Sequence, residues 1–393
     1  MKRNYYLYRF WPIYRMLVKH KLAKRCAICA LNEKCVTIQD SVCEICREEH
    51  TSKKPAAELS NNLAAEKELD ELLTEAQGKG RGIYDAIVLF SGGKDSTYIL
   101  NRLRKHYKKL HIVALTVDNG FRSPIGKQNT EIICEHLDVD HLEIRPYQIF
   151  KKLYKYGFEN FSHFGFIGTD VWEGELFQDI GRNLAAQMDI PLLVLGYTPE
   201  QATFLPKEFD EYHLYGSEEF KFKESQKFTR EKFLGVNLKD IFTPEEMNYW
   251  WDASKWSVDK IPTIVLPFQA WGYHKTEIVN EVVSKLHLLL DEKSMNPMLT
   301  NDLYVSLGIF LDYQIFGYSP MYELEFARYV RTGKEDVKQN RNLWESAEYN
   351  FLKHEKSVLD SPDIQLCLSK LGLTKTALFS IIKKSKARLD GKH

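Results

Sequence analysis

The chain has 393 residues, of which 44% are hydrophobic, so it can bury a sizeable core in two or three domains. Lysine plus arginine and aspartate plus glutamate both number 54, which gives a formal net charge of zero. This balance argues against a large uniform basic surface for nucleic acid, although a local basic patch stays open. No apolar run reaches the length of a transmembrane helix, and the start does not have the pattern of a secretory signal.

The seven cysteines are unevenly distributed, and five of them lie between residues 26 and 46. The pairs Cys26-x-x-Cys29 and Cys43-x-x-Cys46 supply the four thiolates of a tetrahedral Zn²⁺ site. Because four thiolates fill the coordination sphere, the predicted role is structural, and Cys35 is interpreted as a spare thiol. The clustering indicates metal binding rather than a disulfide framework, and it predicts a reducing, cytoplasmic environment.

The basic leader, residues 1–25, contains many aromatic residues and no acidic one. One interpretation is a segment that contacts an anionic membrane surface or an acidic partner. The other is an aromatic segment that packs on the rest of the protein, with its basic groups in water. Pro12 is expected to interrupt a continuous amphipathic helix, which favours the packed segment.

Changes in composition divide the chain into four regions. We expect a leader with the zinc module at 1–52, a helical linker at 53–82, a nucleotide-binding domain at 83–290 and a C-terminal helical region at 291–393. An aromatic and charged insertion, 201–260, interrupts the third region. It either covers the active-site edge and carries substrate contacts, or it is a structural excursion.

Short apolar segments alternate with amphipathic helices in the nucleotide-binding region. The helix before the fourth strand is expected over 175–188, and Ser123 and Pro124 are typical of a helix start. This alternation predicts an α/β fold with a doubly wound parallel sheet, whose ligands bind at the carboxyl ends of the strands. The expected strands are YDAIVLF (84–90), HIVALTV (111–117), HLEIR (141–145), PLLVL (191–195) and PTIVLPF (262–268).

The segment IVLFSGGKDSTYIL, residues 87–100, places a short polar loop between the first strand and the first helix. Gly92 and Gly93 let the backbone approach a ligand closely, and the N–H groups at the helix start point toward an anion. Lys94 adds a cation for phosphate oxygens, while Asp95 would repel phosphate unless Mg²⁺ lies between them. Hydroxyl donors complete the predicted nucleotide site at Ser91, Ser96 and Thr97.

Two further segments end strands on the same edge of the predicted sheet. Asp118 and Asn119 follow the second strand and are expected to reach adenosine. Gly196 and Thr198 follow the fourth strand, where the glycine permits close approach and the threonine offers a hydroxyl. Asp-Asn-Gly and single glycines are also favoured in ordinary turns, so this alternative stays open.

The sequence Ser-Gly-Gly-Lys-Asp-Ser after a buried strand resembles the PP-loop of the ATP pyrophosphatase superfamily, which has an adenine nucleotide alpha-hydrolase-like fold. The resemblance implies ATP and Mg²⁺ as cofactors. It also implies that the loop holds the β- and γ-phosphates as a leaving pyrophosphate. The α-phosphate is then transferred, as AMP, to an oxygen of the second substrate.

Both ends of the chain are similar to the N-acetyl sugar amidotransferases of pseudaminic acid, legionaminic acid and O-antigen biosynthesis. The similarity lies in the four-cysteine module and in the tail, FARYVRTGKEDV and LGLTKTALFSIIKKSK. It implies that ATP activates the acetamido group of a nucleotide-activated sugar and that ammonia converts it to an acetamidino group. The acetamidino sugar would serve the biosynthesis of surface polysaccharide, lipopolysaccharide or flagellin glycans. The sequence has no glutaminase elbow of the form Gly-x-Cys-x-Gly, so a separate glutaminase subunit is expected to supply the ammonia.

Individual side chains receive roles within this chemistry. Lys94 is expected to stabilise charge on the phosphates, and Asp95 to hold Mg²⁺. Arg182 either reaches substrate or phosphate, or lies on a solvated helix face. Glu173 and Glu175 either steer ammonia and bind sugar hydroxyls, or stabilise the first turn of a helix.

The loop alone also permits an ATP-dependent tRNA-modifying enzyme that thiolates a base or forms lysidine. Sulfur transfer is disfavoured because only Cys134 and Cys367 remain outside the cluster that includes Cys35. The tail 362–385 either reads DNA as a helix-turn-helix or packs on the protein, and the zero net charge favours packing without a nucleic-acid partner. A homodimer stays open, and the intact loop argues against a nucleotide-binding scaffold without chemistry.

Overall fold

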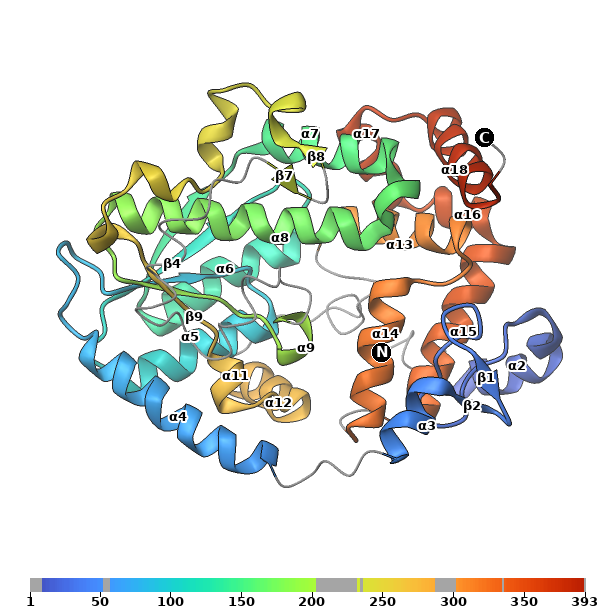
Figure 1. Cartoon of the computed structure of the whole chain (residues 1–393), viewed down its shortest axis with the longest axis horizontal. Coiled ribbons are helices and arrows are strands. Elements are labelled where there is room, and N and C mark those ends of the chain that lie inside the picture. The colour runs from blue at the N-terminus through green and yellow to red at the C-terminus, as the bar shows by residue number, and fades with distance from the viewer. Residues whose placement is uncertain are drawn as a thin grey trace. The chain divides into compact units, whose positions relative to one another are not determined.

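The computed structural model describes residues 9–51, 57–202, 232–233, 236–286, 302–333 and 336–391 (Figure 1). The chain forms two compact units. One combines residues 1–54, 154–170 and 290–393, and the other combines 55–153 and 171–289. Within the described ranges, every helix is either too short or too polar to span a bilayer.

The second unit is built on a five-stranded parallel sheet, which confirms the predicted doubly wound α/β fold. The strands pair in the order β5-β4-β3-β6-β9. All pairings are parallel, and every residue of β4, which lies between β5 and β3, is buried, as expected for a sheet covered on both faces. The strands are β3 (Ala86–Leu89), β4 (Ile112–Val117), β5 (Asp140–Ile144), β6 (Leu192–Val194) and β9 (Thr263–Val265).

The strand order creates a switch point between β3 and β6. Chain order runs from β3 through β4 to β5 in one direction, and β6 and β9 are then added on the other side of β3. Val88 of β3 pairs with Ala114 on one side and Val194 on the other, so the carboxyl ends of these strands lie at one edge. Open α/β sheets bind ligands in the crevice at such a reversal.

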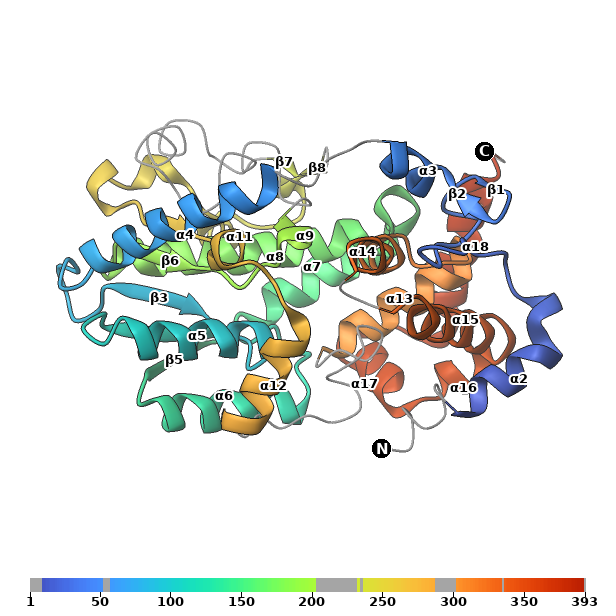
Figure 2. The same ribbon diagram turned by 90° about the horizontal axis from the view of Figure 1, so that it is seen from below.

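Helices cover both faces of this sheet (Figure 2). α5 (Lys94–His106) and α6 (Pro124–Leu137) lie on one face, and α8 (Phe161–Gln187) lies on the other. The Ser123 hydroxyl accepts a hydrogen bond from the Gly126 N–H, and Pro124 occupies the first turn of α6, as predicted.

Helix α8 begins much earlier than residue 175, where the sequence pattern placed its start. Residues 161–174 contain no proline to stop the helix, although their glycines have low helix propensity. Glu173 and Glu175 therefore lie in the helix interior, so the prediction of first-turn glutamates is wrong.

Other helices of this unit surround the sheet. α4 packs against α11, and α5 packs against α12. The predicted insertion is described only in part, since residues 203–231 lie outside the described ranges. Its later part packs Trp251 and Ala253 against Ala186 of α8, together with Ile261 just after the insertion. The elements not yet given are α4 (Ala57–Glu75), α7 (Tyr147–Glu159), α9 (Pro199–Ala202), α11 (Pro267–Trp271), α12 (Lys275–Leu286), β7 (Lys232–Phe233), β8 (Val236–Asn237) and 3₁₀ turns at Leu238–Asp240, Glu246–Tyr249, Ala253–Lys255 and Val258–Lys260.

The first unit joins the two ends of the chain. The cysteine segment forms the small hairpin β1–β2 followed by α3, and the described part of the C-terminal region is helical, as predicted. α13 is buried almost throughout and packs against α15, α17 and α18, so the C-terminal pair serves as a packing element. The elements are α2 (Trp11–Val18), β1 (Ile38–Gln39), β2 (Val42–Cys43), α3 (Glu44–Thr51), α13 (Leu303–Ile315), α14 (Pro320–Arg331), α15 (Val337–Lys353), α16 (Glu355–Leu359), α17 (Pro362–Leu371) and α18 (Lys375–Leu389).

Helix α2 corrects the expectation about Pro12. The proline lies in the first helical turn, where its missing N–H costs nothing, so the helix begins there instead of being interrupted. Trp11 is fully buried and lies 5.9 Å, between ring centroids, from Tyr349 of α15. One face of the leader is therefore packed on the protein.

Arg25 holds the cysteine module against two helices. Its guanidinium donates to Glu323 of α14 at 2.7 Å and to Glu348 of α15 at 3.0 Å. All three side chains are buried, and Tyr313 donates a further hydrogen bond to Glu323 at 2.9 Å. Burial disfavours the charged guanidinium, but the attraction of the carboxylates outweighs it and raises the pKa of Arg25.

Arg25→Met tests this contact. Removing the cation leaves two buried carboxylates without their counter-charge, so we expect the free energy of unfolding to fall by about 3–5 kcal/mol. Urea unfolding followed by far-UV circular dichroism measures the change. Lys375→Met, which removes an ion pair with Asp360 between half-exposed side chains, is the matched control and should change little. Equal stability of the two variants would contradict the role of Arg25.

Candidate functional site

The loop after β3 is shaped by Gly92. This residue has φ +72°, a left-handed conformation that favours glycine. A Cβ atom at this position would lie 2.7 Å from the Gly126 carbonyl oxygen and 2.9 Å from Thr130 Cγ2, both in α6. The loop therefore bends tightly over α6, and only glycine fits the bend.

The same loop delivers the start of α5. Gly93 is the N-cap residue, and its carbonyl accepts the Thr97 N–H at 3.0 Å to close the first turn. The first N–H groups of a helix have no partner within the helix and favour an anion. The hydroxyls of Ser91 and Ser96 lie 3.3 Å apart within the turn, and Thr97 is fully buried. Of the three residues, Ser91 is exposed, whereas Ser96 and Thr97 are buried.

Asp95 is held from two sides. Lys94 Nζ donates to one carboxylate oxygen, and the Tyr273 hydroxyl donates to the other at 3.0 Å. Lys94 Nζ also lies 5.8 Å from the centroid of the Tyr273 ring. Tyr273 is buried and follows α11, which itself follows β9, so it reaches the same sheet edge. The sequence prediction missed Tyr273, although its place after the fifth strand was a usable signal.

Arg122 is a second residue that the sequence prediction missed. Its Nη2 donates to the Ser91 carbonyl at 3.1 Å and to the Gly126 carbonyl at 2.7 Å. Its Nη1 lies 3.7 Å from Glu143 Oε2. Arg122 therefore fixes the loop to the start of α6 and adds positive charge beside it. Its position just after β4 was again the available signal.

Asp118 and Asn119 lie after β4, as predicted, and both are buried. Asp118 accepts the Gly120 N–H at 2.8 Å and forms ion pairs with Lys127 at 2.9 Å and Arg145 at 3.2 Å. Burial raises the pKa of Asp118, but the hydrogen bonds from Lys127 and Gly120 outweigh it, so the pKa is lowered. The Asp118 carboxylate thus stabilises the turn after β4 and pairs with two neighbouring basic side chains.

Asn119 connects the turn to α8. Its Nδ2 donates to Glu173 Oε1 at 2.6 Å, and its Oδ1 accepts the Phe121 N–H at 2.8 Å. The structure therefore brings Glu173 to the same edge as the loop. Glu175, two residues further along α8, is also buried.

Gly196 and Thr198 follow β6 at the switch point. A Cβ atom at Gly196 would lie 3.6 Å from the Ser96 backbone, an ordinary contact, so the protein itself does not require glycine there. The Thr198 hydroxyl accepts the Gln201 N–H at 3.2 Å and caps α9. Gly196 approaches the loop closely, while Thr198 has a structural task.

Arg182 lies in α8 and is fully buried. Its guanidinium carbon lies 6.0 Å from the centroid of the Trp251 ring, and its Nη1 lies 3.6 Å from a carboxylate oxygen of Asp179. The solvated helix face expected as the alternative for Arg182 is therefore wrong, and its role toward substrate or phosphate stays a prediction.

The four cysteines of the two Cys-x-x-Cys pairs form a cluster that can bind a metal ion. Their sulfur atoms all lie within 4.8 Å of one another. The Cys26 and Cys46 sulfurs are 3.9 Å apart, and the Cys29 and Cys43 sulfurs are 3.7 Å apart. Four thiolates at about 2.3 Å from one tetrahedral ion lie roughly 3.8 Å from each other, so the geometry fits a single ion.

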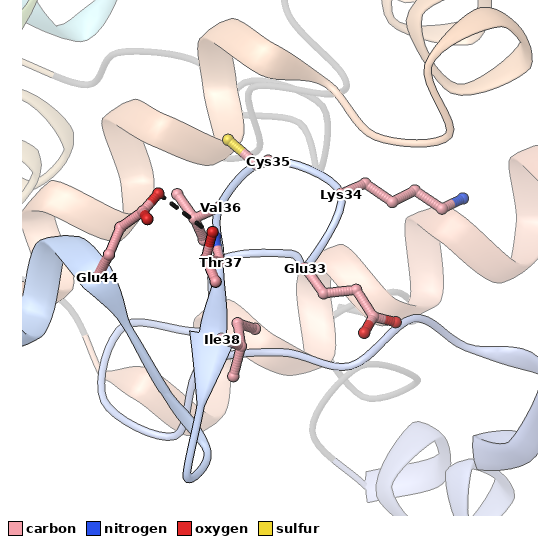
Figure 3. A pocket seen from close by; sticks show the side chains of 7 residues that line it. All are labelled: Glu33, Lys34, Cys35, Val36, Thr37, Ile38 and Glu44. Atoms are coloured by element: carbon pink, nitrogen blue, oxygen red, sulfur yellow. Dashed lines mark hydrogen bonds between the residues drawn. The ribbon is translucent and has the colours of Figure 1, made fainter.

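The cluster is supported by α15 and bordered by an open pocket. Asn340 donates to the Cys29 carbonyl at 3.2 Å, and Arg341 donates to the Cys26 carbonyl at 3.1 Å. Figure 3 shows the pocket, of about 500 Å³, in which the Thr37 N–H points to the Glu44 carboxylate. None of the nucleotide-loop residues lines it. Its lining residues are Glu33, Lys34, Cys35, Val36, Thr37, Ile38 and Glu44.

Gly92→Ala and Gly196→Ala form a matched pair of variants. Gly92→Ala places a side chain in a left-handed, crowded position, so we expect a loss of about 1–2 kcal/mol in the free energy of unfolding. Gly196→Ala should leave stability unchanged. Urea unfolding measures stability, and equilibrium titration with ATP measures affinity. A stable Gly92→Ala variant would contradict the described turn, and a stable Gly196→Ala variant that loses ATP affinity would assign that glycine to the ligand.

A family model matches the part of the chain that carries the loop. The family model of the queuosine biosynthesis protein QueC matches residues 85–159. An uncharacterized protein of Methanocaldococcus jannaschii is 35% identical over 74 residues, which are 19% of this chain and 26% of that protein. The chain thus spans about a quarter of the length of this relative.

Among solved structures, the chain is similar to the U34-tRNA thiolase NcsA from Methanococcus maripaludis with its 4Fe-4S cluster. The identity is 12% over 86% of this chain and 90% of that chain, at a TM-score of 0.32. The QueC match, the doubly wound parallel sheet and the Ser-Gly-Gly-Lys-Asp-Ser loop at its switch point together indicate a member of the PP-loop ATP pyrophosphatase superfamily.

Proposed function

We propose that the protein is an AMP-forming amidotransferase that converts the N-acetyl group of a nucleotide-activated sugar to an acetamidino group. One observation carries the ATP-dependent part of this proposal. The loop after β3 places Lys94, Asp95 and an anion-binding helix start at the switch point of the sheet. The choice of an N-acetyl sugar is supported by the four-cysteine module and the C-terminal tail, which are similar to that enzyme group.

The chemistry follows from the weak reactivity of an amide. The amide oxygen attacks the α-phosphorus of ATP, the α–β bond breaks, and pyrophosphate leaves as the amide nitrogen loses its proton. Ammonia then adds to the carbon of the resulting imidoyl adenylate and gives up a proton. The C–O bond breaks, and AMP leaves with that oxygen. The loop N–H groups and Lys94 stabilise the charge that develops on the leaving pyrophosphate.

Mg²⁺ is the ion that such a loop implies. Asp95 is the residue that would hold it, and one partly exposed carboxylate suits an ion that keeps several waters and phosphate oxygens as ligands. When bound, the ion neutralises phosphate charge. Tyr273 orients the carboxylate through its hydrogen bond, and Lys94 lies within reach of the same group.

The cysteines outside the cluster support amidation over thiolation. Cys134 is buried in α6, and burial raises the pKa of its thiol to about 12. Cys367 is buried in α17, and burial raises the pKa of its thiol well above the ordinary value. A thiol that stays protonated at neutral pH is a poor nucleophile for sulfur transfer. A separate glutaminase would supply the ammonia, and a homodimer and cytoplasmic location remain part of the proposal.

Zn²⁺ is the proposed ion of the cysteine cluster. The sulfur distances fit one tetrahedral ion, and four thiolates leave no open position for a substrate. In a four-iron cluster each thiolate binds a different iron, which would hold the sulfurs further apart. The ion would therefore stabilise the module rather than take part in catalysis.

An ATP-dependent tRNA-modifying enzyme is the second candidate function. The observation that bears on it is the match of residues 85–159 to the family model of a queuosine biosynthesis protein, which connects this fold region with nucleoside chemistry. This match covers the ATP-binding strands and helices, so it bears mainly on the nucleotide half of the reaction.

Product analysis of the whole protein tests both candidates. We expect AMP and pyrophosphate with ATP, Mg²⁺, ammonium and a nucleotide-activated N-acetyl sugar, and neither with total tRNA. AMP formed only with tRNA would show that the second substrate is RNA rather than a sugar. ADP as the product would mean that the β–γ bond of ATP is broken, which would contradict the chemistry of the superfamily.

Asp95→Asn tests the loop. It removes the carboxylate that would hold Mg²⁺ and should lower AMP formation by about 100-fold or more. Chromatography of AMP measures the rate, and unchanged urea unfolding shows an intact fold. Asp259→Asn, the same change at a half-exposed surface ion pair with Arg81, should retain full activity. Full activity of Asp95→Asn would exclude the assigned role.

Cys43→Ser tests the metal site. Loss of one thiolate should abolish stoichiometric zinc and destabilise the first unit. Cys35→Ser changes a thiol that packs beside the cluster and should retain zinc. Metal content by mass spectrometry and thermal unfolding give the two readouts. Retained zinc in Cys43→Ser, or iron in the parent protein, would refute the proposed ion.

A further inference from the structure

Helix α2 is fixed to the protein by one face. Trp11 and Val18 are buried on this face, and the Tyr14 hydroxyl lies 3.0 Å from the Tyr349 hydroxyl of α15. Arg15 Nη2 donates to Glu345 Oε1 at 2.9 Å. The orientation of α2 on α15 is therefore set by aromatic packing and a charged hydrogen bond.

The opposite face of α2 is apolar and exposed. Ile13, Met16 and Leu17 are 63%, 65% and 69% exposed. They are three and four residues apart, which places them on one side of a helix. Single exposed apolar side chains are common, but three adjacent ones on one helix face need a partner.

The stretch that contains this helix carries basic residues and no acidic ones. No acidic residue precedes Glu33 in the sequence. Arg9 before the helix and Lys19, Lys21 and Lys24 after it are all exposed. Arg15 is already bound to Glu345, so the exposed basic side chains lie at the two ends of α2.

We infer that α2 is an interfacial helix that binds the surface of a bilayer containing anionic lipid. An apolar helix face bordered by lysines is the pattern of helices that lie in the plane of the headgroups. The exposed face offers aliphatic side chains and no hydrogen-bonding group, which fits acyl chains better than an acidic protein surface. Because α2 is already folded on α15, docking would not require ordering of this helix.

The small size of the face determines the strength of docking. Three aliphatic side chains bury little area, so apolar contact alone gives weak binding, and the lysines must add attraction to anionic headgroups. Binding should therefore be reversible, salt-sensitive and selective for anionic vesicles. This inference is independent of the chemistry proposed for the loop after β3.

Vesicle flotation of the full-length protein tests the inference. We expect the protein to float with phosphatidylcholine–phosphatidylglycerol vesicles at low salt, and to stay behind with phosphatidylcholine alone or at high salt. Ile13→Ser/Leu17→Ser should reduce the bound fraction about tenfold or more. Leu366→Ser/Leu389→Ser, the same change at exposed sites on α17 and α18, is the matched control and should bind like the parent.

Lys19→Gln/Lys21→Gln separates charge from apolar contact, and it should weaken binding at low salt only. Equal binding to neutral and anionic vesicles, or parent-like flotation of Ile13→Ser/Leu17→Ser, would overturn the inference. Loss of self-association in that variant, with a parent that never floats, would assign the face to a second copy of the chain and also overturn it. AMP formation without vesicles is measured in parallel and should be unchanged in every variant.

Discussion

The geometry of the candidate nucleotide site, at the carboxyl edge of the sheet, depends on the left-handed turn at Gly92. Its backbone lies against α6, where any side chain would collide with the Gly126 carbonyl and Thr130. That contact directs the chain from β3 into α5 at the switch point of the sheet. The helix start, Lys94 and Asp95 are then presented together, and residues from other strand ends, Tyr273 and Arg122, are added to this fixed frame.

The remainder of the molecule is arranged around a different kind of contact. The segment around the four clustered cysteines is too small to form a hydrophobic core by itself. It packs instead against helices from the other end of the chain. Arg25 makes the attachment specific, because its two hydrogen-bonding directions must meet one carboxylate on α14 and one on α15. Polar contacts thus define how the module is placed, while α13 supplies the apolar core.

Local patterns made the sheet, the loop and the cysteine cluster predictable. Apolar runs bounded by turns mark buried strands, and the glycine pair after β3 marks a backbone that must bend. Tyr273 was missed because it is separated from Asp95 by 178 positions, and Arg25 from Glu348 by 323. The burial of Arg182 depends on Trp251, which a helical pattern alone does not reveal. Pairings of this kind depend on tertiary packing and leave no periodic trace in the sequence.

Helix α15 has a consequence for how the first unit responds to change. Within one helix, Asn340 and Arg341 bind carbonyls of the cysteine loops, Glu348 binds Arg25, and Tyr349 packs on Trp11 of α2. These contacts share one helix, so a change that unfolds or displaces α15 would weaken all of them together. The cysteine module and α2 therefore depend on a single common support rather than on separate ones.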